Sequence, residues 1–276
     1  MNRSARRFDQ LTWPEVRELA PQPGSTLVWP FGACEQHGPH LPLATDALFA
    51  ERILDLVLAD LDRALPIWRL PGQAIGFSPE HQSFPGTLSL SSELLIGIVA
   101  QLGAQLAGMG WQRLVLFNAH GGQIGLLQVA ARELRQRCPH MAVLPCFLWS
   151  GVAGLDTLIP AGELMHGLHA GLGETSLMLQ LAPDLVGTSR PVDGLASADV
   201  HQLPPPGWSL EGAAPCAWLT DDLSPSGVIG DSRDASVSLG SALEKRLVQH
   251  WSSLFDVLLR SSWPPSSQQA DGTSAS

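Results

Sequence analysis

Carboxylates and imidazoles occur in this sequence at spacings that suit a metal site. Glu35 and His37 are two residues apart in a segment expected to be extended, and in an extended chain that spacing turns both side chains to one face. Asp46 follows His37 by nine residues and stands beside the expected start of a helix, where a carboxylate is well placed to bridge two cations. These three residue types together predict a divalent-metal site.

Two further side chains extend the candidate site. His120 follows a strand-like apolar run and precedes Gly121 and Gly122, which allow the backbone to approach closely, so it is a natural fourth ligand. Glu174 is the fifth candidate. Because five side chains with one bridging carboxylate exceed the needs of a single catalytic zinc, we expect two divalent ions. Mixed nitrogen and oxygen ligands suit Zn²⁺ together with Mn²⁺ or Fe²⁺.

Alternating strand and helix patterns position these residues. Short apolar, β-branched runs predict strands, and apolar residues at helical spacing predict helices. Strand, glycine turn, helix and strand around His120 form a βαβ unit, so we expect a mostly parallel sheet with helices on both faces and functional groups at the carboxyl ends of the strands. Strands are expected over 26–32, 113–117 and 141–148, and helices over 12–20, 47–61, 91–108, 126–137, 169–181 and 235–259.

Length and composition fit one large domain. The chain has 276 residues, of which 45% are hydrophobic and 15% are charged, and this is enough for a sizeable core. We expect the domain to span 1–260. A proline- and glycine-rich loop is expected over 203–227, where it could form a lid, and a disordered tail over 261–276.

Charge and residue usage limit the expected partners and location. Sixteen basic and 26 acidic residues give a net charge of −10, which repels nucleic acid and anionic membranes. The longest apolar stretch, 94–111, is interrupted by glutamines and glycines and is typical of a packed helix. No apolar stretch follows the basic N-terminus, so a cytoplasmic location is expected. Cys34, Cys138, Cys146 and Cys216 form no Cys-x-x-Cys pair and are expected to be small buried thiols.

Five motifs resemble the signatures of a known family. They run over 32–46 (Gly-Ala-Cys-Glu-Gln-His-Gly-Pro-His-Leu-Pro-Leu, then Thr-Asp), 84–87 (Phe-Pro-Gly-Thr), 118–122 (Asn-Ala-His-Gly-Gly), 169–176 (His-Ala-Gly-Leu-Gly-Glu-Thr-Ser) and 227–231 (Gly-Val-Ile-Gly-Asp). In this order and combination the sequence resembles the creatininase (creatinine amidohydrolase) family, over roughly residues 9 to 258.

The resemblance implies a fold, a cofactor and a reaction. The fold would be a single-domain α/β/α layered sandwich with a mostly parallel sheet, and the protein would be a homo-oligomer, often a hexamer in this family. The resemblance also implies a binuclear divalent-metal site in which Glu35 and His120 hold one ion, His37 helps to hold the other, and Asp46 bridges them. The implied reaction is hydrolysis of a non-peptide C–N bond in a small amide, with His169 handling protons.

The sequence departs from creatininase itself just after the predicted metal-binding histidine. The creatinine-hydrolysing enzyme has a Tyr-Glu pair where Gly121 and Gly122 stand, and there the glutamate binds metal and the tyrosine touches substrate. In branches of the family with the His-Gly-Gly version, the carboxylate of the Glu-Thr-Ser motif is the replacement ligand, and here that residue is Glu174. The missing Tyr-Glu pair argues against creatinine as the substrate. The substrate pocket is expected to include Trp149, which matches a second pocket tryptophan of creatininase, together with His81 and Gly121.

Several functions are compatible with these residues. The main expectation is a metal-dependent amidohydrolase that acts on a cyclic or formyl amide through a metal-activated water. A formamidopyrimidine-type deformylase and a mycofactocin-type precursor peptidase are alternatives within the same family. A non-catalytic metal-binding subunit is an alternative from another class, and the intact set of candidate ligands together with His169 argues against it.

Overall fold

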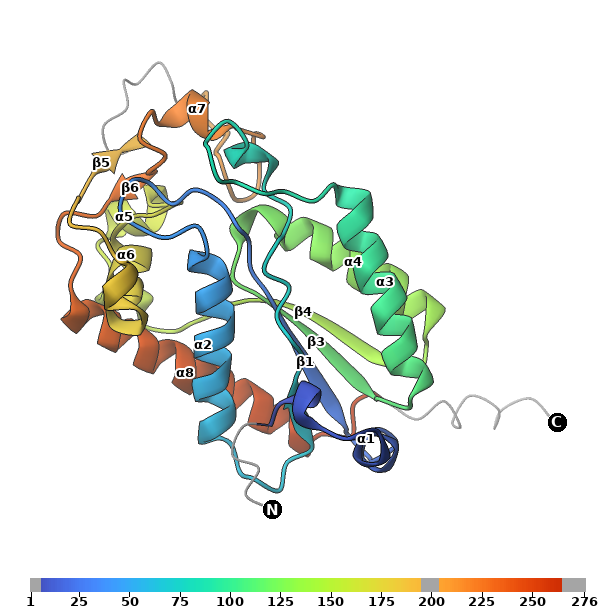
Figure 1. The fold of residues 1–276 in the computed structure, drawn as a ribbon. Helices are drawn as coiled ribbons and strands as arrows, with labels where there is room; N and C mark the ends of the chain where they lie inside the picture. Colours follow the sequence, from blue (N-terminus) through green and yellow to red (C-terminus); the bar gives the residue numbers. More distant parts are fainter. Residues whose placement is uncertain (1–5, 195–203, 265–276) are drawn as a thin grey trace.

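A four-stranded parallel sheet forms the centre of the computed structural model, which describes residues 6–194 and 204–264 (Figure 1). The strands are β1 (Thr26–Phe31), β2 (Ile67–Arg69), β3 (Arg113–Asn118) and β4 (Ala142–Phe147), in the order β2-β1-β3-β4. Every pairing between them is parallel. The predicted mostly parallel α/β sheet is therefore confirmed.

Helices cover both faces of this sheet (Figure 1). One layer holds α2 (Thr45–Asp60), α6 (Leu172–Leu181) and α8 (Val237–Arg260), and the other holds α3 (Ser92–Gly108) and α4 (Ile124–Arg137). The remaining elements are α1 (Trp13–Leu19), α5 (Ala161–His166), α7 (Thr220–Leu223) and an antiparallel pair, β5 (Val192–Asp193) with β6 (Gly230–Asp231). The result is an α/β/α sandwich.

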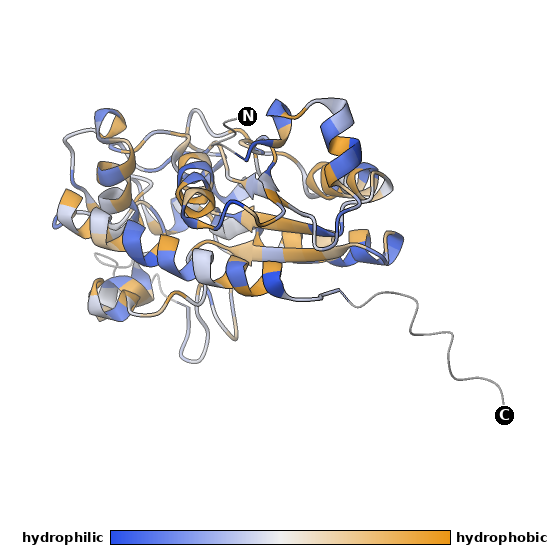
Figure 2. Ribbon diagram, turned by 90° about the horizontal axis from the view of Figure 1, so that it is seen from below, coloured by the Kyte–Doolittle hydropathy of each residue, from blue (hydrophilic) through white to orange (hydrophobic). Residues whose placement is uncertain are grey.

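Two apolar clusters fill the space between the layers. Alternate strand residues point to opposite faces. Val115 and Phe117 of β3 therefore join the cluster under α2, α6 and α8, whereas Leu114 and Leu116 join the cluster under α3 and α4. Viewed from below, the strands are mostly apolar and the helices carry polar residues on their outer sides (Figure 2). Burial on both faces explains the continuous apolar runs by which these strands were predicted.

Helix starts follow the predicted capping patterns. The Glu15 carboxylate accepts a hydrogen bond from the Thr12 backbone N–H at 2.7 Å at the start of α1, as in a capping box. Ser91 caps α3 by accepting from the Leu94 N–H. The helix predicted over 169–181 begins later, at Leu172, because the backbone at Ala170 is left-handed (φ 55°) and His169 forms a bridge with Ile229.

Three further predictions agree with the structure only in part. The 203–227 segment contains α7 but is otherwise without regular structure where it is described. Residues 261–264 follow α8, and the Arg113 guanidinium donates to the carbonyls of Ser261 and Trp263; the rest of the predicted tail, 265–276, lies outside the described residues. All four cysteines are free thiols, but only Cys138 is fully buried, so the prediction of general burial was wrong.

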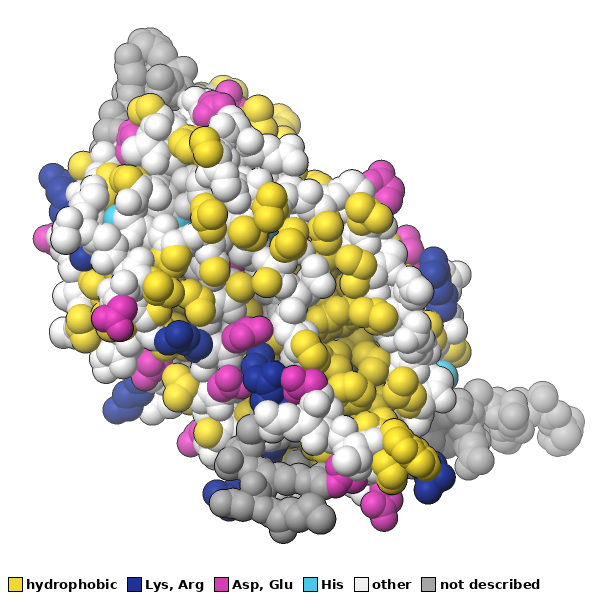
Figure 3. All heavy atoms as spheres, in the orientation of Figure 1, with side chains coloured by type: hydrophobic (Ala, Val, Ile, Leu, Met, Phe, Trp, Pro, Cys, Tyr) yellow, Lys and Arg dark blue, Asp and Glu magenta, His cyan; other side chains and the backbone are white. Residues whose placement is uncertain are grey.

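Among the helices of residues 6–194 and 204–264, none is both long enough and apolar enough to cross a bilayer. On the face seen in Figure 1, acidic and basic side chains are interspersed and apolar side chains are common near the centre (Figure 3).

The packing of α8 on α6 gives a test of the fold. A Cβ at Gly240 of α8 would overlap the Ser176 carbonyl oxygen, whereas a Cβ at the exposed Gly97 of α3 would meet no atom within 4 Å. We expect Gly240→Ala to lower the free energy of unfolding by about 1–3 kcal/mol through overpacking. Gly97→Ala should raise it by up to about 1 kcal/mol through helix propensity. Urea denaturation of both variants measures this difference, and equal midpoints would contradict the packing argument.

Candidate metal centre

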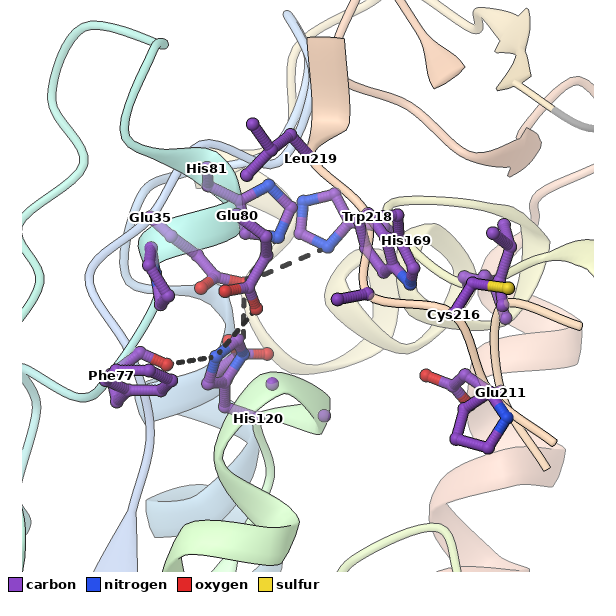
Figure 4. A pocket seen from close by; sticks show the side chains of 18 of the residues that line it. Glu35, Phe77, Glu80, His81, His120, His169, Glu211, Cys216, Trp218 and Leu219 are labelled. Atoms are coloured by element: carbon purple, nitrogen blue, oxygen red, sulfur yellow. Dashed lines mark hydrogen bonds and ion pairs between the residues drawn. The ribbon is translucent and has the colours of Figure 1, made fainter. Parts of the chain in front are cut away.

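The candidate ligands come from the carboxyl ends of the strands and from two helix starts. Glu35 and His37 lie in the loop after β1, and Asp46 lies in the first turn of α2. His120 follows the end of β3, and Glu174 lies in the first turn of α6. All of them except His37 line a single cavity of about 570 Å³ (Figure 4). The structure therefore brings together side chains that are far apart in the sequence.

Two trios of ligand atoms share one residue. Glu35, Asp46 and His120 form the first trio, and His37, Asp46 and Glu174 form the second. Within each trio the ligand atoms lie within 4.8 Å of one another. Asp46 thus belongs to both trios, and Glu174 belongs to the second.

Local hydrogen bonds hold His120 in this position. The Asn118 side chain accepts from the His120 backbone N–H at 3.0 Å and donates to the His120 carbonyl at 2.6 Å. Gln123 in turn donates to the Asn118 side-chain oxygen at 2.9 Å and to the Gly32 carbonyl at 3.0 Å. The turn after β3 is thereby tied to the loop after β1, which carries the first two ligands.

Backbone carbonyls set the tautomers of both candidate imidazole ligands. His120 Nε2 lies 3.0 Å from the Phe77 carbonyl, and His37 Nδ1 lies 3.2 Å from the Glu35 carbonyl. A carbonyl only accepts, so these nitrogens carry the protons. In the neutral rings the other nitrogens hold the lone pairs, and these nitrogens face the carboxylates: His120 Nδ1 lies 3.2 Å from Glu35 Oε1, and His37 Nε2 lies 3.5 Å from Asp46 Oδ1. Metal-binding histidines are commonly oriented in this way.

Several buried polar atoms of the centre have no hydrogen-bond partner among the described residues. They are both carboxylate oxygens of Glu35, Oδ2 of Asp46 and Nε2 of His37. Their side chains are at most 3% exposed. Buried charged groups without partners are costly, and all four atoms belong to residues of the two trios. This chain's own donor set therefore fits a pair of divalent cations.

The facing charges perturb the pKa values of the ligands strongly. Burial is the largest single effect and opposes protonation of His37, yet the carboxylates of Asp46, Glu174 and Glu35 together raise the pKa of His37 to about 9. The pKa of Asp46 is lowered by His37 and His120, although burial acts in the other direction. Burial raises the pKa of Glu174 to about 7. The potential at the centre is strongly negative, so it favours cations.

Two more imidazoles lie against the centre, stacked on each other. The rings of His81 and His169 are 4.2 Å apart at 28° (Figure 4). His169 Nδ1 lies 3.8 Å from Glu35 Oε1, and His169 also forms a third candidate trio with Glu35 and His37. Burial lowers the pKa of His81 to about 4 and that of His169 well below its usual value. Both rings are thus neutral at physiological pH.

One residue of the site, Glu80, was missed by the sequence analysis. It lies in the short 3₁₀ turn Pro79–His81, and its carboxylate is 3.5 Å from His120 Nε2. A Cβ at Gly122 would overlap the Glu80 carboxylate. Gly122 therefore leaves room for a carboxylate that arrives from a distant loop. No local sequence pattern signals this contact.

The predicted substrate residues fall into two adjoining cavities. His81 and Gly121 line the cavity of the metal centre, together with Trp218 and other residues of the 203–227 segment. Trp149 instead lines a neighbouring cavity of about 270 Å³, which shares Gly121 and Glu174 with the first. Trp149 also packs edge-on against Phe49 in the core. It therefore lies beside the metal cavity and outside its lining.

The fold and the clustered ligands together are typical of metal-dependent hydrolases of the α/β class. Residues 9–255 match the creatininase family, described as creatinine amidohydrolase. The chain belongs to this family, a family of hydrolases, and the predicted resemblance is confirmed.

Relatives and solved structures agree with this assignment. A mycofactocin precursor peptide peptidase from Mycobacterium ulcerans is 34% identical over 86% of this chain and 82% of its own length. A creatinine amidohydrolase from Pseudomonas putida is 34% identical over 67% of this chain and 75% of its own length. A structure titled "Creatininase Mn" superposes with a TM-score of 0.74 and 27% identity, over 93% of this chain and 100% of that one. The name of that structure includes manganese.

Removal of the His120 imidazole tests the ligand assignment. We expect His120→Ala to bind fewer divalent ions per chain than the wild type, because the first trio loses its only nitrogen ligand. The matched control is His140→Ala, since His140 is an exposed histidine outside the candidate trios, with its Nε2 3.2 Å from the Ala107 carbonyl. Metal content after reconstitution and gel filtration is the measurement. Unchanged stoichiometry in His120→Ala would overturn the assignment.

The space left by Gly122 gives a second test of the centre. Gly122→Ala should push the Glu80 carboxylate away and disturb His120, so we expect metal affinity to fall by about 10–100-fold, the usual effect of disturbing groups around ligands. Gly125→Ala in α4 is the control, because a Cβ there meets no atom within 4 Å. Competition with a chelating dye reports the affinity. Equal affinities for the two variants would contradict the proposed role of Gly122.

Proposed function

We propose that this chain is a metal-dependent amidohydrolase that cleaves a non-peptide C–N bond in a cyclic or formyl amide. The observation that carries the proposal is the position of Asp46, shared by two ligand trios at a cavity of about 570 Å³. A cavity of this size suits a small organic substrate. The family to which the chain belongs supports the same class of reaction.

The proposed ligands divide between two ions. Glu35, Asp46 and His120 would hold one ion, and His37, Asp46 and Glu174 would hold the other. Mixed nitrogen and oxygen donors favour Zn²⁺ with Mn²⁺ or Fe²⁺. When bound, such a pair lowers the pKa of a water toward neutrality and polarises a carbonyl group.

His169 is the proposed proton carrier. Its Nε2 donates to the Gln36 carbonyl at 2.7 Å, so the ring is held in one orientation and proton exchange is left to Nδ1. His169 Nδ1 lies 3.8 Å from Glu35 Oε1 and faces that side of the cavity. In the proposed reaction His169 takes up a proton at Nδ1 and returns it to the leaving nitrogen of the amide.

The residues that line the cavity limit which substrates fit. Gly121 and Gly122 provide no side chain at the position where the creatinine-hydrolysing enzyme has a Tyr-Glu pair, so creatinine is not the proposed substrate. Phe77, Leu168 and Trp218 contribute apolar surface to the lining of the cavity. A small amide with an apolar portion fits this lining.

A mycofactocin-type precursor peptidase is the second candidate function. It is favoured by the relative of that description, 34% identical over 86% of the chain. The neighbouring cavity of about 270 Å³ beside Trp149 also offers room for a side chain of a longer substrate. A peptide would then extend from one cavity into the next.

Assembly and location form part of the proposal. Exposed apolar side chains on α3 and α4, among them Leu94, Leu102 and Val129, offer surface for a homo-oligomer, a hexamer by analogy with the family. The free cysteines are in keeping with a reducing, cytoplasmic compartment.

Hydrolysis assays on metal-reconstituted protein test the function. We expect turnover on at least one member of a panel of cyclic amides, formyl amides and short peptides, because the cavity and the ligand trios are complete. Chelation should abolish this activity, and added Zn²⁺ or Mn²⁺ should restore it. A protein with two bound ions per chain and no turnover on the whole panel would instead be the non-catalytic binding subunit.

Removal of the His169 imidazole shows whether His169 is a metal ligand or a proton carrier. We expect His169→Ala to keep both ions and to lose about 10²–10⁴-fold in kcat, the usual contribution of a general acid or base. Metal content and steady-state kinetics are measured on the same preparation. Since His169 also belongs to the third trio, a drop in bound metal would show that it acts as a ligand.

A further inference from the structure

The stacked pair of His81 and His169 presents two different nitrogens to the cavity. His169 donates from Nε2 to the Gln36 backbone carbonyl at 2.7 Å. A carbonyl cannot donate, so in the neutral ring Nδ1 has a lone pair. His169 therefore faces the centre as an acceptor or base.

His81 has the opposite arrangement. Its Nδ1 lies 2.8 Å from the side-chain Nε2 of Gln36, while its own Nε2 lies 3.6 Å from Glu35 Oε1. An amide nitrogen only donates, so Nδ1 of His81 must accept and Nε2 carries the proton. The Nε2–H group of His81 therefore points toward the metal centre.

The amide of Gln36 cannot turn over to reverse this assignment. Its Oε1 accepts from the Gly38 backbone N–H at 2.8 Å, and its Nε2 donates to the Gly227 carbonyl at 3.0 Å. A flipped amide would oppose two acceptors at one contact and two donors at the other. The Thr220 hydroxyl lies 2.6 Å from His81 Nδ1 and 2.9 Å from the Glu80 carbonyl, and it has one proton to donate. Because Gln36 donates to Nδ1, this proton is directed to Nδ1 in the assigned tautomer and not to the Glu80 carbonyl.

Gln36 therefore orients both rings, through its backbone carbonyl and through its side-chain amide. It is 5% exposed, and His81 is 2% exposed, so water does not compete strongly for these bonds. His81 also lines the cavity and stands next to the proposed proton carrier (Figure 4). A neutral ring with a fixed N–H beside a base is suited to stabilise negative charge that develops on a substrate oxygen.

We propose that His81 is a further catalytic residue, a neutral hydrogen-bond donor to the carbonyl oxygen of the scissile amide, and that Gln36 is the positioning residue that fixes its tautomer. This inference rests on the proposed hydrolase function. The proton stays on His81 throughout: Nε2–H donates to the oxygen as the carbonyl becomes tetrahedral, and the proton that leaves with the amine comes from His169. The bond strengthens as negative charge forms, so it acts on kcat.

Two substitutions at His81 test the donor. His81→Leu removes the N–H, and we expect kcat to fall by about 10²–10³-fold, as for loss of one oxyanion donor, with KM and metal content unchanged. His81→Gln can supply an amide N–H near the same position and should recover part of the loss. Wild-type kcat in His81→Leu, loss of bound metal in that variant, or no recovery in His81→Gln would each overturn the proposal.

The isosteric variant Gln36→Glu tests the positioning role. A carboxylate accepts where the amide donates, so it should draw the proton of His81 to Nδ1 and leave a lone pair toward the centre. The backbone bond to His169 is unaffected. We expect kcat to fall to the level of His81→Leu while metal content stays close to the wild type. The unfolding temperature should fall, because the carboxylate also loses the bond to the Gly227 carbonyl. The control is Thr220→Val, which removes the other contact of Nδ1 without reversing the tautomer, and it should stay within a few-fold of the wild type.

A spectroscopic measurement separates this inference from the proposed function. Long-range ¹H–¹⁵N correlation spectra of the Zn²⁺-reconstituted protein, labelled at histidine, report which ring nitrogen carries the proton. We expect His81 to be protonated at Nε2 in the wild type and at Nδ1 in Gln36→Glu. Protonation at Nδ1 in the wild type would overturn the inference even if amides are hydrolysed. Absence of turnover on every substrate, with Nε2 protonated, would instead count against the hydrolase function.

Discussion

The shared carboxylate of Asp46 is the interaction on which the centre depends. Its two oxygens lie 3.5 Å from His37 Nε2 and 3.4 Å from His120 Nδ1, and the residue is 2% exposed. A buried carboxylate is stable only beside positive charge or donors. Because the two histidines follow β1 and β3 while Asp46 opens α2, the sheet and this helix must be docked before the carboxylate is compensated. Fold and site are thus parts of one electrostatic arrangement.

Main-chain carbonyls of the surrounding loops then decide what each imidazole does. The carbonyls of Glu35 and Phe77 leave lone pairs on the two candidate ligands, and the carbonyl of Gln36 does the same for His169. Only His81 meets a side-chain donor in their place. The four histidines of the centre therefore acquire different roles. Each role depends on the group that the ring nitrogen facing away from the centre contacts.

The elements named by local sequence patterns agree with the structure, with limits that have physical causes. Capping residues at Thr12 and Ser91 and apolar runs in the strands act within a few residues, so the pattern and the structure coincide. The short strand β2 escaped prediction because three residues carry too little periodicity. The helix at Leu172 starts later than its apolar pattern, because a left-handed Ala170 interrupts it.

The sequence by itself determined the residue types and spacings of the candidate site: Glu35, His37 and Asp46 stand close in the chain, and His120 follows a strand whose end must lie at the same sheet edge. Only the tertiary structure decided that Glu80 fills the space beside Gly122, that His81 stacks on His169, and that Trp149 lies in a neighbouring cavity. The reason is that periodicity and turn chemistry are local properties of the chain. Contacts between distant loops depend instead on how the layers pack, and no local pattern encodes that packing.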